Sequence, residues 1–345
     1  MTERLAAIFG CAGDVLTGTE LAFFRDVRPV GLILFGRNCQ TPEQVRRLTQ
    51  SWRDAVGLDD VLVLIDQEGG RVCRLGPPHW RAPPAAAEFG SLFEVDEVLG
   101  IESVRLNGHV IAAELRELGI NVDCVPVLDV PAAGAHDIIG DRAYASDPDT
   151  DTVVTLGRAM CEGLQAGGVL PVIKHIPGHG RATVDSHEAL PVVSTNREEL
   201  DRLDFTPFRM LADLPLAMTA HVVFTALDER RPATTSPEVI QLIRNDIGFD
   251  GLLMTDDLSM KALPDSMEDR TRDSRAAGCD VVLHCNGKAS EMTAVASCAG
   301  PLDAPGRGRL DRAFGRLHPP EPIDIPAAVA RIDSLLGQVG LGVRT

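Results

Sequence analysis

The chain has 345 residues, of which 44% are hydrophobic and 24% charged, and its 50 acidic and 33 basic residues give a net charge of −17. This balance is typical of a soluble globular enzyme and excludes a disordered or fibrous chain. A strongly negative surface repels phosphate backbones and anionic lipids, so we expect no nucleic-acid partner and no membrane partner. No segment approaches the ~18 to 20 consecutive apolar residues that a membrane span needs.

The cysteines and the N-terminus bear on the compartment. Eight cysteines are dispersed along the chain, and none forms a C-x-x-C pair. A chain this long and this apolar does not need a disulfide framework, so we expect free thiols in a reducing environment. The N-terminus lacks the basic region, long apolar stretch and small-residue cleavage site of a secretory signal. The sequence therefore predicts a cytoplasmic protein.

Short apolar segments alternate along the chain with longer amphipathic segments. Near-continuous apolar strands separated by helices are typical of a parallel sheet that is covered on both faces. About eight such strands over this length favour a closed (β/α)8 barrel, the TIM-like α/β fold, over an open doubly wound sheet. The predicted strands begin at Ala6, Gly31, Val61, Val122, Val169, Leu216, Gly251 and Asp280, and the main predicted helices span Pro42–Val56, Val98–Leu118, Asp151–Ala166, Arg197–Ala212 and Pro237–Asp246.

No low-complexity linker divides the chain, so we expect a single catalytic barrel domain over residues 1–345. The segment richest in Pro and Ala, Gly76–Gly90, follows a predicted strand and is interpreted as a long loop between that strand and the next helix. The C-terminal part, about 305–340, is predicted to form two further helices between Leu310 and Leu336. We expect a monomer.

Charged and polar residues cluster where the predicted strands end. In a (β/α)8 barrel these C-terminal strand ends form one mouth, and active sites lie there. Polar residues from distant parts of the chain would therefore converge, which indicates an enzyme. The third predicted strand ends with Asp66, the fourth with Asp129, the fifth with Lys174 and His175, the sixth with His221, and the seventh with Asp256 and Asp257.

Several of these residues also have a purely structural interpretation. Asp66 and Glu68 precede a Gly pair, where acids often only shape a turn. Asp129 is interpreted preferentially as a hydrogen-bond acceptor for loop amides. Arg142 could form a surface ion pair. Lys174 ends an apolar strand, and it must be paired or functional because burial of an unpaired charge is costly.

The His-rich segment after the fifth predicted strand admits three functional interpretations. His175, His179 and His187 could bind a metal together with Asp185, but the intervening Pro and Gly residues disfavour that site. Lys174 could form a Schiff base with a carbonyl substrate. Alternatively, Asp185 could hold one imidazole nitrogen of His187 and leave the other to transfer a proton.

Asp256 and Asp257 are adjacent acids at the end of a strand. Neighbouring side chains alternate in a strand, so we expect one acid to face the substrate and the other to cap the following turn. A carboxylate on a rigid strand end suits a nucleophile or a group that stabilises an oxocarbenium ion.

These motifs, in this order, resemble family-three glycoside hydrolases, and within them the single-domain bacterial β-N-acetylhexosaminidases of cell-wall recycling. The matching segments include LIDQEGGRVCRL, IIGDRAYASDP, VIKHIPGHGRATVDSHEALP and GFDGLLMTDDLSM, and the resemblance spans roughly residues 31–286. The KHIPGHG…DSH pattern is the most specific of them. The chain departs from the family pattern at Cys73, Ile176 and Gly36, where Gln, Phe and Lys are common, and these differences bear on subsite preference.

The resemblance assigns a role to eight residues. Asp256 matches the family nucleophile, and His187 matches the acid/base of this subgroup, with Asp185 as its partner. Related glucosidases and xylosidases usually take their acid/base carboxylate from a further domain, so the DSH loop favours a hexosaminidase. The sugar-binding positions implied by the resemblance are Asp66, Arg74, Arg142, Lys174 and His175.

The resemblance therefore implies a retaining β-N-acetylglucosaminidase that acts through a covalent glycosyl-aspartate, without a metal or a cofactor. The implied substrate is a small muropeptide with a terminal N-acetylglucosamine, GlcNAc-β-1,4-anhydroMurNAc-peptide. Four alternatives stay open at this point: a β-glucosidase or β-xylosidase, an N-acetylglucosaminide phosphorylase of the same family, a Schiff-base lyase that uses Lys174, and a sugar-binding barrel without catalysis.

Overall fold

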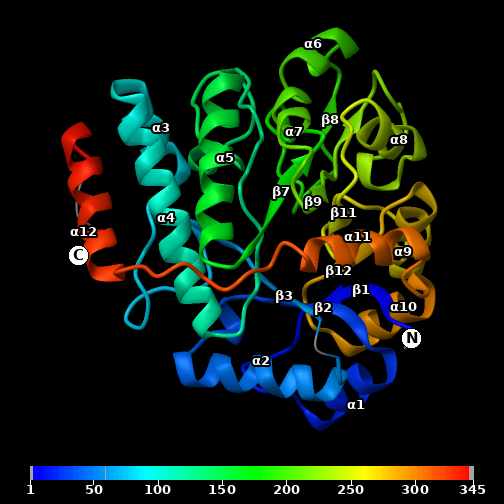
Figure 1. Ribbon diagram of the computed structural model, residues 1–345. Coiled ribbons are helices and arrows are strands. Elements are labelled where there is room, and N and C mark those ends of the chain that lie inside the picture. Colours follow the sequence, from blue (N-terminus) through cyan, green and yellow to red (C-terminus); the bar gives the residue numbers. More distant parts are fainter. Residues whose placement is uncertain (1–2, 59, 342–345) are drawn as a thin grey trace.

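The computed structural model describes residues 3–58 and 60–341. At its centre, eight parallel strands form a closed barrel in the order β1-β12-β11-β9-β7-β6-β3-β2 (Figure 1). The predicted (β/α)8 fold is confirmed, and the open doubly wound sheet is excluded. The strands are β1 (Leu5–Phe9), β2 (Pro29–Leu34), β3 (Leu62–Ile65), β6 (Val122–Asp123), β7 (Leu170–Ile176), β9 (Leu216–Thr219), β11 (Leu252–Asp257) and β12 (Val281–His284).

Helices surround the barrel, and four of the five helices predicted on its wall begin and end within one residue of their predicted bounds. The segment predicted as one helix over Arg197–Ala212 is divided into α6 (Arg197–Arg202) and α7 (Thr206–Met210). Pro207 causes the division, since it has no N–H to continue a helix and is accommodated in the first turn of a new one. The other helices on the barrel wall are α1 (Gly18–Val27), α2 (Pro42–Val56), α3 (Ala86–Val95), α4 (Glu97–Glu117), α5 (Thr150–Ala166), α8 (Pro237–Asn245), α9 (Met267–Ala277) and α10 (Ala289–Ala299).

Helix α2 illustrates how local sequence sets these boundaries. The Thr41 hydroxyl caps its N-terminus, and Pro42 occupies the first turn, where its missing N–H costs nothing. The helix ends at Gly57, which adopts a left-handed conformation with φ of 66°. Between these ends, apolar residues at helical spacing face the barrel and are buried: Val45, Leu48, Trp52 and Val56.

Side chains of the barrel strands alternate between two apolar layers. Leu62 and Leu64 of β3 belong to the cluster inside the barrel, whereas Val63 and Ile65 belong to the cluster between barrel and helices. The two C-terminal helices extend this arrangement. Leu310 of α11 (Ala304–Phe314) joins the interior cluster and so closes the end of the barrel opposite the mouth.

The chain then crosses the outside of α5 and α4 to reach α12 (Ile325–Leu336), beside α4 (Figure 1). The two predicted C-terminal helices are therefore present. The first begins at Ala304 rather than Leu310, because the Asp303 carboxylate caps its N-terminus. The first turn contains Pro and Gly residues, so the sequence shows no helical pattern there. Likewise, the predicted loop Gly76–Gly90 ends in the first residues of α3. Of the helices that the structure describes, none combines the length and apolar character of a membrane span.

Two short strand pairs lie outside the barrel sheet. The hairpin of β4 (Gln67–Gly69) and β5 (Val72–Cys73) follows β3, and β8 (Val192–Val193) pairs with β10 (Val223–Phe224). Gly69 has φ of 101°, and a Cβ there would lie 2.1 Å from the Pro84 carbonyl oxygen. Only glycine fits this hairpin, which holds Glu68 and Arg74 at the mouth.

Asp123, at the end of β6, is a buried acid with incomplete hydrogen bonding. Its Oδ1 accepts the Gln67 amide at 2.9 Å, while its Oδ2 is buried without a partner among the described residues. Burial raises the pKa of Asp123 to about 8, against the opposing effects of the Gln67 amide and Lys174. At neutral pH this carboxyl group is therefore protonated in the folded protein.

We expect Asp123→Asn to make the protein more stable at pH 8, and much less so at pH 5. The raised folded-state pKa means that stability is full below the unfolded pKa, about 4, and falls as pH rises towards 8. The variant has no proton to lose, so its gain over wild type should reach about 1–3 kcal/mol at pH 8. Urea unfolding at both pH values, followed by circular dichroism, measures the difference. The exposed Asp273→Asn is the control, and equal shifts in both variants would contradict the expectation.

Candidate active site

The C-terminal ends of the strands enclose a pocket of about 320 Å³. Seven of the eight residues that the sequence placed in a site line this pocket, and the eighth, Asp185, is hydrogen-bonded to one of them. The structure therefore brings together residues that are up to 190 positions apart in the chain, from Asp66 to Asp256. The seven lining residues are Asp66, Arg74, Arg142, Lys174, His175, His187 and Asp256.

The two acids that end β11 have different surroundings. The Asp257 carboxylate accepts the amides of Ser259 at 2.9 Å and of Cys285 at 3.0 Å, so it fixes the turn after the strand. Asp256 lines the pocket, and its Oδ1 accepts the Asp257 amide at 2.8 Å. Both acids therefore border the pocket, but the Asp257 carboxylate is occupied by the turn, and Asp256 is the acid that remains available to a ligand.

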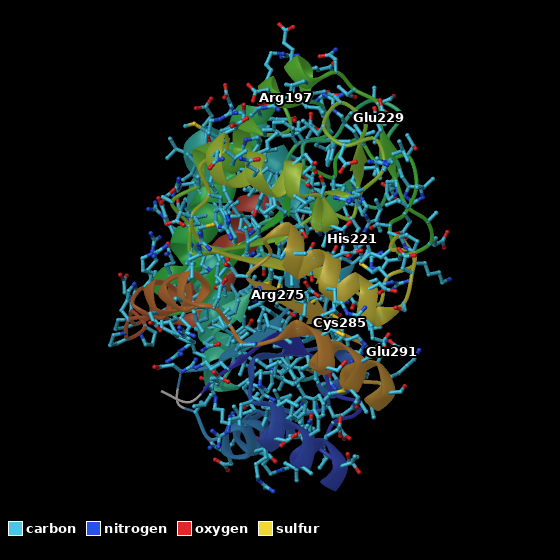
Figure 2. All side chains as sticks on the ribbon, turned by 90° about the vertical axis from the view of Figure 1, so that its right-hand side faces the viewer. Arg197, His221, Glu229, Arg275, Cys285 and Glu291 are labelled. Carbon is cyan, nitrogen blue, oxygen red and sulfur yellow. The ribbon has the colours of Figure 1, made fainter. Side chains whose placement is uncertain are left out.

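Asp256 is surrounded by groups that favour its charged form. Burial alone would raise the pKa of Asp256, but His175, His221 and the Asp257 amide outweigh burial and lower that pKa below its usual range. His221 is itself fixed, because its Nδ1 lies 2.7 Å from the Thr234 hydroxyl. His221 and Cys285, which follow β9 and β12 on either side of β11, are labelled in Figure 2. An ionised carboxylate at this position is the form that attacks carbon.

A buried ion network forms one wall of the pocket. Lys174 Nζ lies 2.9 Å from Asp66 Oδ1 and 2.6 Å from Glu68 Oε1. Arg74 binds the second oxygen of Asp66 at 3.0 Å, and Arg142 holds both oxygens of Glu68 at 2.8 and 2.9 Å. The Lys174 side chain is only 3% exposed. It is therefore a paired lysine, and Asp66 and Glu68 serve as its counter-ions rather than as turn-forming acids.

The network keeps the buried Lys174 and its two carboxylate partners charged. Burial opposes the charge of Lys174, but Asp66 and Glu68 outweigh burial and raise the pKa of its ammonium above the usual value. Against burial, Arg142 and then Lys174 hold the pKa of Glu68 at about 2. A lysine that stays protonated is not a nucleophilic amine, which argues against the Schiff-base lyase. Arg142 is also more than a surface ion pair, since its side chain is 10% exposed and its pKa is raised by Glu68 against burial.

Asp129 organises the loop after β7. Its Oδ1 accepts the amides of His175 at 3.2 Å and of His179 at 2.7 Å, which confirms its interpretation as an acceptor for loop amides. Its Oδ2 lies 2.7 Å from His175 Nδ1. This second bond fixes the His175 ring and leaves Nε2 as the ring nitrogen available to a ligand.

Asp185 and His187 form the pair that the sequence predicts. Asp185 Oδ1 lies 2.8 Å from His187 Nδ1 and also accepts the His187 amide at 2.8 Å. The pair leaves His187 Nε2 without a partner in the described chain. The His187 side chain is 63% exposed at the mouth of the pocket, so it can meet a group that enters from solvent.

The histidines do not assemble around a metal position. Within residues 3–58 and 60–341, no group of three or more His, Cys, Asp or Glu side chains has the geometry to hold a metal ion. Instead His175, His179 and His187 bind three different partners, which are Asp129, Ser186 and Asp185.

Sequence reasoning missed or undervalued some residues of the site. Glu68 was considered only as a turn acid, although a buried Lys174 beside two arginines required a second carboxylate. His179 was considered only as a metal ligand, and Ser186 was not considered at all. His221 was noted only for its place at a strand end, because no local pattern shows that it lies beside Asp256.

The comparisons with known proteins agree with this geometry. The model of the glycosyl hydrolase family 3 N-terminal domain matches residues 23–317. A β-hexosaminidase from Nitrosomonas eutropha is 35% identical over 309 residues, which cover 88% of this chain and 87% of that protein. A β-hexosaminidase from Methylobacillus flagellatus is 36% identical over 341 residues, or 95% and 94% of the two chains.

Among solved structures, native NagZ from Neisseria gonorrhoeae has a TM-score of 0.84 and 30% identity, with 99% of each chain covered. The family model spans most of the barrel, and the relatives match along nearly their whole length. The chain therefore belongs to glycosyl hydrolase family 3 and falls among its β-hexosaminidases.

Proposed function

We propose that the chain is a retaining β-N-acetylglucosaminidase in which Asp256 is the nucleophile and His187 is the general acid and base. One observation carries this proposal: a buried, ionised carboxylate and an exposed imidazole, which is held by a carboxylate behind it, line the same pocket. Retaining hydrolysis needs a nucleophile and a proton-transfer group on either side of the scissile bond, and Asp256 and His187 supply these two groups.

The reaction proceeds in two steps. In the first, Asp256 attacks the anomeric carbon, the bond to the leaving oxygen breaks, and His187 gives its Nε2 proton to that oxygen. In the second, neutral His187 takes a proton from water, the water oxygen attacks the anomeric carbon, and the bond to Asp256 breaks. An imidazole avoids the repulsion that a second carboxylate would meet beside ionised Asp256.

The ion network gives the pocket a polar wall for one sugar residue. Asp66, Lys174 and Arg74 present alternating acceptors and donors to sugar hydroxyls, and His175 adds a ring nitrogen. Support for an N-acetylated sugar comes from NagZ of Neisseria gonorrhoeae, which has been solved in complex with N-trifluoroacetyl-D-glucosamine. With one Tyr and two Trp in the whole chain, an extended aromatic platform for polysaccharide is disfavoured.

The natural substrate that we propose is a muropeptide, GlcNAc-β-1,4-anhydroMurNAc-peptide. The terminal sugar would occupy the pocket, and the muramic acid part would extend past the exposed His187 into solvent. The cytoplasm is the compartment that we propose, because all eight cysteines are free thiols and most are buried in apolar surroundings.

The first test is the release of 4-nitrophenol from its β-N-acetylglucosaminide by wild type and Asp256→Ala, both in the presence of EDTA. We expect activity in wild type and only background in the variant, because the attacking oxygen is lost. The matching glucoside should be a much poorer substrate. A wild type that prefers the glucoside, or an Asp256→Ala variant with wild-type activity, would overturn the assignment.

The second test compares leaving groups in His187→Ala. We expect kcat/KM for a methyl glycoside to fall by about 10²–10⁴-fold, because its alkoxide needs a proton to depart. Loss of kcat/KM for the 4-nitrophenyl glycoside should be far smaller, since 4-nitrophenolate leaves without protonation. His79→Ala changes an exposed histidine away from the pocket and should match wild type. An equal loss on both substrates in His187→Ala would rule out the acid role.

A further inference from the structure

Ser186 is the buried centre of the segment that carries the catalytic pair. It stands between Asp185 and His187, yet it is 3% exposed, whereas the His187 side chain is 63% exposed. A serine between a half-buried and an exposed residue is itself buried because its own contacts draw it inward. The contacts of Ser186 therefore show how this segment is attached to the barrel.

Two hydrogen bonds attach Ser186 to different parts of the mouth. Its hydroxyl lies 3.1 Å from His179 Nε2, in the loop after β7. Its carbonyl oxygen accepts the Ala262 amide at 3.2 Å, in the segment after β11. β7 and β11 carry His175 and Asp256 near their C-terminal ends, so Ser186 joins the segment to the pocket from both sides.

Asp185 and His187 have no comparable attachment of their own. Among the described residues, their side chains hydrogen-bond only within the segment, with Asp185 bound to the ring and the amide of His187. The bonds of the pair fix the imidazole relative to the carboxylate, but not relative to Asp256. That second relation depends on the attachment of Ser186.

His179 is a rigid anchor for this attachment. Its amide donates to Asp129 at 2.7 Å, and its ring lies 5.5 Å from the His175 ring, between centroids. The adjacent Gly180 packs against residue 130 so closely that a Cβ would lie 1.9 Å from the Val130 carbonyl oxygen. Burial and His175 lower the pKa of His179 to about 4, so the ring is neutral around pH 7. A neutral ring has one N–H and one lone pair, and Ser186 is its only side-chain partner in the described chain.

We propose that the His179–Ser186 hydrogen bond holds His187 over Asp256, and that both residues are positioning residues for proton transfer to the leaving group. This inference rests on the proposed role of His187. Loss of the bond would leave the Asp185–His187 pair intact but free to move relative to the pocket. A displacement of about 1 Å can cost about 10²-fold in rate when a proton must be transferred along a defined line.

The test measures kcat/KM of Ser186→Ala on the methyl and 4-nitrophenyl β-N-acetylglucosaminides. We expect a loss of about 10–100-fold on the methyl glycoside and a much smaller loss on the 4-nitrophenyl glycoside. Ser186→Thr retains the hydroxyl and should restore activity on the methyl glycoside. Ser297→Ala, on the exposed face of α10, is the matched control and should behave as wild type on both substrates.

His179→Phe removes the partner nitrogen and keeps a ring, so it provides an independent variant if Ser186→Ala does not fold. It should show the same dependence on leaving group. The double variant Ser186→Ala/His179→Phe should lose no more kcat/KM on the methyl glycoside than either single variant does. In a His187→Ala background, Ser186→Ala should cause no further loss, because there is no acid left to position.

The outcomes separate this inference from the proposed function. If His187→Ala itself shows no dependence on leaving group, the acid role of His187 is wrong, and the positioning role falls with it. Suppose instead that His187→Ala shows that dependence, but kcat/KM of Ser186→Ala falls equally on both substrates or falls on neither. The acid role then stands and the positioning role is overturned. An additional loss from Ser186→Ala in the His187→Ala background also overturns it.

Discussion

The site depends above all on one buried ammonium group. Lys174 enters the pocket from the end of an apolar strand, and its charge is tolerated only because Asp66 and Glu68 lie within 3 Å. Those acids in turn hold Arg74, from the same hairpin as Glu68, and Arg142, from the loop after β6. Removal of Lys174 would leave Asp66 and Glu68 without the buried counter-ion that they share. The network therefore fixes the relative positions of three loops as well as the polar character of the wall.

The pocket uses charge differently on its two sides. On one side, acids and bases neutralise each other in fixed pairs and offer hydrogen-bonding groups whose charges do not change near neutral pH. On the other side, Asp256 stays ionised without an arginine or lysine bound to it, because histidines and a backbone amide stabilise it more weakly. A carboxylate with strong salt bridges would be a poor nucleophile, since those bonds would have to break in the attack. The weaker surroundings of Asp256 fit the role that we propose for it.

Much of this arrangement could be predicted from the sequence. Apolar strand runs located all eight barrel strands, and the polar residues at their ends located the mouth. The division of roles between Asp256 and Asp257 followed from the alternation of side chains. What escaped prediction depends on contacts across the barrel: the Glu68 partners come from residues 142 and 174, and the Ser186 partner is set by how a loop folds back. Asp123 escaped because a two-residue strand carries no periodic signal that tells which way its side chain points.

The closure of the barrel by α11 has a kinetic consequence. The strands fill the barrel interior with apolar side chains, and Leu310 and Ala313 cover the end of the barrel opposite the mouth. Within the described chain, the pocket therefore communicates with solvent through its mouth alone. A sugar held at the inner end has to depart by the route through which the rest of the substrate arrived. In the reaction that we propose, release is then ordered: the aglycone leaves first, water takes its place, and the free sugar leaves last, so that accumulated sugar would compete directly with incoming substrate.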